Sequence, residues 1–125
     1  MRLHHVALGA RDVERVAAFY RDLLGLSERQ RHSYADGRLR SIWLSIADDA
    51  WLMVEHSEEP QRHVESVAAG PFLLAFRVSP AEREQVEAKL SAQGYAIESR
   101  SEFTSYTRDP ERNRVAISHY PERAP

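Results

Sequence analysis

The amino-acid sequence predicts an α+β protein in which one β-α-β-β-β unit occurs twice. A strand pattern, a helix pattern and three further strand patterns follow one another in residues 1–57, and the same order returns in residues 71–121. Each helix pattern also has its own start and stop signals. Repetition of element order at this spacing indicates two similar modules within one 125-residue domain. The charged stretch 58–70, which contains Pro60, is expected to connect them.

The first module begins with an apolar strand at residues 3–9 and continues into a helix. Asp12 is a suitable N-cap for this helix, and Gly25 is a suitable C-terminal stop. Between them, apolar side chains recur at helical spacing: Val13, Val16, Ala17, Tyr20, Leu23 and Leu24. Three strands are then predicted at residues 27–34, 39–47 and 50–57, joined by turns at Asp36-Gly37 and Asp48-Asp49.

The second module repeats this order with stronger helix signals. After an apolar strand at residues 72–78, the stretch Ser79-Pro80-Ala81-Glu82 supplies an N-cap, a proline at the first helical position and a capping-box glutamate. The helix is expected to end at Gly94 and to turn Val86 and Leu90 inward. Strands are predicted at residues 95–101, 103–108 and 114–120, the last after a tight turn at residues 108–113.

Composition narrows the range of functions. Hydrophobic residues make up 42% of the chain, enough for a core, and the net charge of −2 with interspersed signs gives no basic footprint for nucleic acid. No long apolar run or basic cluster indicates a membrane, and the polar N-terminus is unlike a signal peptide, so a cytoplasmic protein is expected. Cysteine is absent, which excludes disulfides, thiolate nucleophiles and cysteine-based zinc sites.

Two segments carry a family resemblance that extends over nearly the whole chain. LHHVALGARDVERVAAFYRDLLGL resembles the opening of the glyoxalase/bleomycin resistance protein/dioxygenase (vicinal oxygen chelate) superfamily, and RDPERNRVAI resembles its closing turn and strand. Arg112 stands where that turn usually has glycine. The resemblance implies two βαβββ modules whose mostly antiparallel sheets curl into a cup around a cleft, commonly in a homodimer. In many members a divalent metal such as Zn, Mn, Fe or Ni lies in the cleft.

Strand alternation sorts the side chains of each strand between a helix-packed face and a cleft face. The ionisable residues assigned to the cleft are His5, Glu55 and Arg77. The remaining members are mostly apolar or aromatic, and those expected to bind ligand are Trp43, Trp51, Met53, Ala116 and Tyr120. Tryptophan and methionine side chains suit a flat apolar ligand; the alternative is that they pack in the core or a dimer interface.

The resemblance also implies four metal-ligand places, on the first, fourth, fifth and eighth strands. His5 and Glu55 match the first two places, whereas Leu73 and Ala116 occupy the other two. Metal sites that do chemistry usually have at least three protein ligands, so the sequence predicts a degenerate site. If His5 and Glu55 converge, a hydrogen-bonded pair could act as a general base without metal.

For the other polar residues the sequence supports only general predictions. Arg77 is expected to hold a ligand carboxylate, with a surface ion pair as the alternative. His56 and His119 have the wrong parity for the cleft and are assigned to its rim, and the charged run at residues 82–84 is assigned to a solvated helix face.

The leading hypothesis is a protein that binds a small apolar or aromatic molecule bearing a carbonyl or acid group. It would either sequester this molecule or act on it through His5 and Glu55. The alternatives are a metal-dependent lyase, isomerase or oxygenase of the same superfamily, and a non-catalytic sensor. A homodimer is expected, with an interface at the first or fifth strand.

Overall fold

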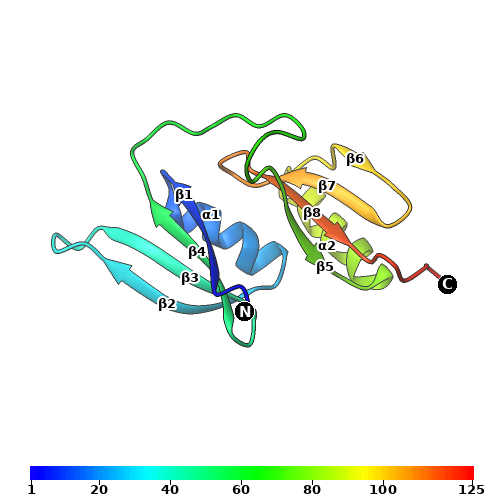
Figure 1. The fold of residues 1–125 in the computed structure, drawn as a ribbon, viewed down its shortest axis with the longest axis horizontal. Helices are drawn as coiled ribbons and strands as arrows, with labels where there is room; N and C mark the ends of the chain where they lie inside the picture. Colours follow the sequence, from blue (N-terminus) through cyan, green and yellow to red (C-terminus); the bar gives the residue numbers. More distant parts are fainter. The chain divides into compact units, whose positions relative to one another are not determined.

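The computed structural model describes all 125 residues, which form two compact units, Met1–Gln61 and Arg62–Pro125. Each unit contains one four-stranded mixed sheet, with the elements in β-α-β-β-β order (Figure 1). The predicted α+β fold with two βαβββ modules is therefore confirmed.

In the first unit the outer strand β1 runs parallel to its neighbour, and the other pairings are antiparallel. The sheet order is β1-β4-β3-β2. The elements are β1 (His5–Ala10), α1 (Val13–Ala18), η1 (Phe19–Leu23), β2 (Ser27–Ser33), β3 (Leu39–Ala47) and β4 (Ala50–His56). The three strands predicted after the helix are present, each within one residue of the expected bounds.

The core of the first unit lies between its helical segment and one face of the sheet. Its fully buried side chains are Val16, Ala17, Tyr20, Ile42, Leu44 and Val54. The Asp12 side chain caps α1 by accepting a hydrogen bond from the backbone N–H of Arg15 at 3.0 Å. The second half of the predicted helix is a π-helical turn, η1, in which the N–H of Leu24 bonds to the carbonyl of Phe19. Phe19 and Tyr20, at the start of this turn, are both buried.

In the second unit β5 runs parallel to β8 and the sheet order is β5-β8-β7-β6. The elements are β5 (Leu74–Arg77), α2 (Pro80–Ala92), β6 (Ser99–Arg100), β7 (Thr104–Arg108) and β8 (Arg114–Ser118). The predicted capping box is confirmed: Ser79 Oγ accepts from the N–H of Glu82, and the Glu82 carboxylate accepts from the N–H of Ser79. Strands β5 and β6 are shorter than predicted, because only these residues pair with a neighbouring strand.

An arginine whose side chain is only 12% exposed joins α2 to the sheet and overturns one prediction. Arg83 Nε donates to Ser105 Oγ at 2.7 Å, and its two terminal nitrogens donate to backbone carbonyls of residues 101, 102 and 104. Its fifth N–H points at His119 Nε2, 3.1 Å away. All five guanidinium donors are thus satisfied. The assignment of residues 82–84 to a solvated face is therefore wrong for Arg83.

His119 also lies elsewhere than expected. It is only 4% exposed, so the assignment to a rim is wrong. Because its Nε2 faces an Arg83 donor, the ring proton sits on Nδ1, which donates to the backbone carbonyl of Glu122 at 2.5 Å. Strand parity placed His119 correctly on the helix side of the sheet, but it could not show that an arginine from α2 would cover it.

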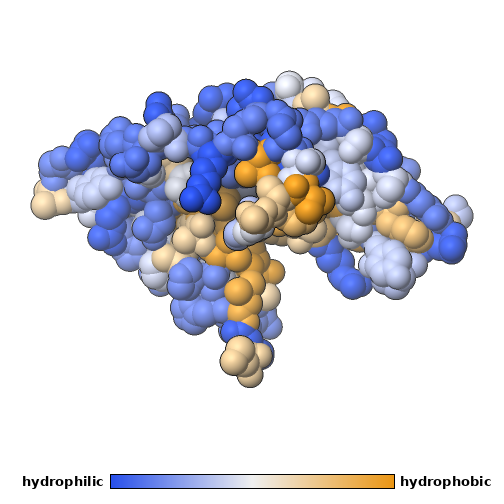
Figure 2. All heavy atoms as spheres, turned by 45° about the horizontal axis from the view of Figure 1, so that its top comes forward, coloured by the Kyte–Doolittle hydropathy of each residue, from blue (hydrophilic) through white to orange (hydrophobic).

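On the face drawn in Figure 2, hydrophilic residues cover most of the surface and apolar residues cover a smaller part of it. The large apolar side chains that are exposed are Met1, Leu3, Val67 and Tyr120. None of the helical segments has the length and apolar character needed to cross a membrane.

Candidate functional site

The candidate site in the first unit is the sheet face opposite α1, which we call the tryptophan face. It is defined by the β1, β3 and β4 residues with this parity: His5, Ala7, Gly9, Ser41, Trp43, Ser45, Trp51, Met53 and Glu55. Residues of the other parity, including Leu52 and Val54, are buried beneath the helical segment. The face assignment made from sequence therefore agrees with the observed register.

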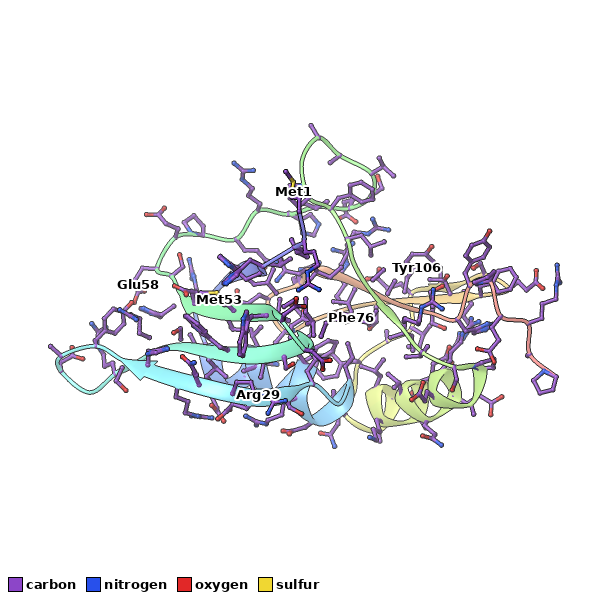
Figure 3. All side chains as sticks on the ribbon, turned by 60° about the horizontal axis from the view of Figure 1, so that its bottom comes forward. Met1, Arg29, Met53, Glu58, Phe76 and Tyr106 are labelled. Carbon is purple, nitrogen blue, oxygen red and sulfur yellow. The ribbon has the colours of Figure 1, made fainter.

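Two tryptophans form the centre of this face. Their ring centroids are 6.2 Å apart with an interplanar angle of 59°, and both side chains are half-buried. Met53 pairs with Trp43 in the register between β4 and β3 and extends the apolar surface (Figure 3). His32, which the sequence did not single out, lies against Trp43 with ring centroids 5.1 Å apart.

The structure does not bring His5 and Glu55 together. Across the β1–β4 pairing, His5 lies opposite Trp51, whereas Glu55 lies opposite Gly9. At about 3.3 Å per residue, four residues along a strand correspond to about 13 Å. His5 instead contacts the neighbouring His4, with 2.8 Å between their Nδ1 atoms.

The Glu55 end of the tryptophan face contains polar atoms that have no partner. Ser41 pairs directly with Glu55 across β3 and β4, and it is only 1% exposed. Neither Ser41 Oγ nor the indole Nε1 of Trp43 has a hydrogen-bond partner, although both atoms are buried. Glu55 itself is half-buried and makes no hydrogen bond or ion pair. Buried polar groups are normally satisfied, so these atoms are exceptions within the first unit.

The equivalent face of the second unit, which we call the alanine face, is simpler. Its central row is Ala75, Ala116 and Tyr106, and the next row is Arg77, Ser118 and Thr104. Figure 3 shows Tyr106, which the sequence reading missed, on the side of β7 away from α2. Ala116 is fully buried, and Arg77 is exposed without a carboxylate partner.

Tyr120 lies beyond the end of β8 and is 65% exposed. Its ring contacts Phe103 edge-on, with centroids 5.2 Å apart. Tyr120, a predicted ligand residue, therefore lies after the end of β8 and not on the alanine face.

The chain belongs to the glyoxalase/bleomycin resistance protein/dioxygenase superfamily, whose family model matches residues 2–117. No curated protein sequence matches it. Among solved structures, a glyoxalase/dioxygenase from Nostoc punctiforme is 23% identical over 97% of this chain and 92% of its own, with a TM-score of 0.79. A possible glyoxalase from Bacillus cereus is 17% identical over 94% of this chain and 98% of its own, with a TM-score of 0.73.

A third similar structure contains a metal. It is the E126Q mutant of the fosfomycin resistance protein FosX from Listeria monocytogenes, complexed with Mn(II) and 1S,2S-dihydroxypropylphosphonic acid. It is 15% identical over 94% of this chain and 91% of its own, with a TM-score of 0.77. At these identities the likeness concerns the fold.

The residues of this chain do not fit the divalent metal that the family implies. No group of three or more histidine, aspartate or glutamate side chains is placed to hold an ion. When β1 and β5 are aligned so that their helix-facing residues coincide, Ala7 aligns with Ala75, and both of these face away from the helix. The strand partner of Ala7 is Met53, and the strand partner of Ala75 is Ala116. By this register the counterpart of Ala116 is Met53 rather than Glu55. A thioether is a soft ligand that suits Cu(I) better than Zn²⁺ or Mn²⁺.

Proposed function

We propose that this protein binds a flat apolar or aromatic small molecule on the tryptophan face, without a resident metal ion. The observation that carries the proposal is the pair of half-buried tryptophans on one face, with Met53 beside them. Covering about 200 Å² of apolar surface there would contribute about 5 kcal/mol before the costs of association.

The polar residues support binding rather than acid–base chemistry by His5 and Glu55. A general base must lie within hydrogen-bond reach of its partner, and the register separates these two by four residues. Arg77 has no carboxylate partner, but it lies on the alanine face of the second unit and is not part of the site proposed on the tryptophan face.

The proposal is tested by thermal melting with naphthalene derivatives in the presence of a chelator. We expect these compounds to raise the melting temperature, and Trp51→Ala to remove most of that rise. Val67→Ala is the matched control, because it also truncates an apolar side chain but one that is 78% exposed and lies in the other unit. A melting temperature that no flat aromatic compound changes would contradict the proposal.

Metal content provides a separate test. We expect protein purified without a metal-affinity tag to contain far less than one equivalent of any divalent metal after dialysis. Retention of nearly one equivalent, with its loss in His5→Ala, would overturn the metal-free part of the proposal and favour a metal-dependent lyase, isomerase or oxygenase.

A further inference from the structure

The carboxylate of Glu55 is unusual among the acidic groups of the first unit. Asp22, Glu28 and Asp36 each pair with an arginine, and Asp49 pairs with Arg2. Glu55 is half-buried and has no such partner. The one arginine on β1, β3 or β4 is Arg40, and it has the parity of the helix-packed Ile42. A carboxylate that is partly withdrawn from water and unpaired is costly, and a bound cation would offset that cost.

Ser41 provides a second acceptor next to this carboxylate. The two residues are paired across neighbouring strands, so their Cβ atoms lie about 5 Å apart. The buried Oγ of Ser41 has no partner within the protein. That oxygen has under 1 Å² of accessible surface, so a ligand group with several N–H donors could bond to both side chains at once only by displacing the atoms that cover Ser41.

There is space for such a group on the other side of Glu55. Its neighbour on β1 is Gly9, which has no side chain. A Cβ built at Gly9 would approach only the side chain of Ser57, at 3.5 Å, which is ordinary van der Waals contact. The backbone there does not require glycine, since its φ lies outside the left-handed range. The missing side chain leaves room above β1 beside the carboxylate.

We infer that the molecule bound on the tryptophan face carries a protonated amine, which the Glu55 carboxylate and Ser41 Oγ recognise together. This rests on the proposed function and adds the chemical class of the ligand. The row that contains Trp43 and Met53 is two residues from Glu55, about 7 Å along the strand. An aromatic ring stacked there reaches Glu55 through a linker of one or two carbons. The ring faces of Trp43 and Trp51 also attract cations. The tryptophan rings and the Glu55 carboxylate therefore both favour a positively charged ligand.

The inference is tested by calorimetry with three probes of the same shape: naphthylmethylamine, naphthylmethanol and naphthylacetate. We expect the amine to bind about tenfold more tightly than the alcohol, as a charge-assisted hydrogen bond allows, and the acid to bind more weakly than either. Glu55→Gln should abolish the preference for the amine while keeping affinity for the alcohol. Glu59→Gln is the matched control, because it removes the same charge from an exposed position in the same unit.

A second variant separates recognition from folding. Ser41→Ala removes a buried hydroxyl that has no partner, so the melting temperature should stay the same or rise. The affinity for naphthylmethylamine should nevertheless fall about threefold to tenfold. Retention of full affinity in this variant would remove Ser41 from the recognition site.

The failures of the two proposals are distinguishable. Equal binding of the three probes, or an amine preference that persists in Glu55→Gln, would overturn the cation inference and leave the binding function intact. If none of the three probes binds, the proposed function itself is overturned and this inference falls with it.

Discussion

The carboxylate of Asp109 accepts hydrogen bonds from both the backbone N–H and the side-chain amide of Asn113, at 2.9 and 2.8 Å. It also accepts from the N–H of Glu111 at 2.9 Å, and the Asp109 N–H donates to the Asn113 carbonyl. Asp109 is 3% exposed, so this turn is closed around a buried anchor. The turn delivers the chain into β8 at Arg114 and so sets which side chains of β8 share the alanine face.

Arg112 is the strained position of this turn, since its φ is +68°. The left-handed region costs a residue with a Cβ about 1 kcal/mol, whereas glycine adopts it freely. We expect Arg112→Gly to raise the free energy of unfolding by about 0.5–1 kcal/mol in urea melts. Glu111→Gly, at a neighbouring position without positive φ, should lower it; equal effects of the two changes would contradict this account.

The stability of the second unit should depend on the ionisation of Glu87. Burial opposes its ionisation, but hydrogen bonds from Arg100 and Ser105 outweigh burial, and its pKa lies below the ordinary 4.5. A depressed folded-state pKa stabilises the fold above 4.5, and that contribution is lost as pH falls through the folded value. We expect Glu87→Gln to be less stable than the wild type near neutral pH, with the difference shrinking below 4.5.

Urea melts at about pH 7 and about pH 3.5 check this behaviour. Glu84→Gln is the control, because Glu84 is exposed on the same helix and has no ion pair or hydrogen bond. A stability difference between Glu87→Gln and the wild type that stays constant with pH would rule out the ionised carboxylate as its source.

The capping box of α2 gives a prediction of stability alone. Ser79→Ala removes the hydroxyl that accepts from the Glu82 N–H at 3.1 Å, and we expect a loss of about 1 kcal/mol in the free energy of unfolding. Binding of aromatic probes should be unchanged, since Ser79 lies outside both sheet faces described above. Ser91→Ala, near the other end of α2 and exposed, should have little effect in the same melts.

Homodimer formation remains a prediction. Strands β1 and β5 are each at the edge of a sheet, with one side of the backbone unpaired in its own sheet. Such edges are suited to pairing with another chain. Sedimentation at tens of micromolar should show a dimer, and replacing Ala7 on β1 with proline should shift it toward monomer. A monomer at these concentrations would contradict the prediction.

The sequence predicted well the features that depend on local chemistry. The caps at Asp12 and Ser79 are governed by side chains within three residues of the helix start, and both were found as expected. Alternation also sorted the residues of β3 and β4 between the two faces, because one face must be apolar to pack on a helix. The short β6 was overestimated, since its length depends on how far β7 extends beside it.

Contacts between elements that are far apart in the sequence were harder to predict from the sequence. The spacing of His5 and Glu55 depends on the register of two strands separated by about forty residues, which neither strand's sequence specifies. The burial of His119 depends on Arg83, from a helix that precedes it by 36 residues. The sequence placed Ser41 on the sheet face opposite α1, as observed, but its lack of a hydrogen-bond partner depends on side chains of other strands.

Substitution of Gly9, the residue beside Glu55, is a simple way in which the ligand specificity of this protein could change. Because the φ of Gly9 lies outside the left-handed range and a Cβ there would meet only Ser57 within 4 Å, a small side chain such as that of alanine or serine could replace the glycine. Under the proposed recognition of an amine, each would reduce the room beside the Glu55 carboxylate. Substitutions at this one position on the edge strand β1 could thus change which members of a series of related compounds fit, according to their length.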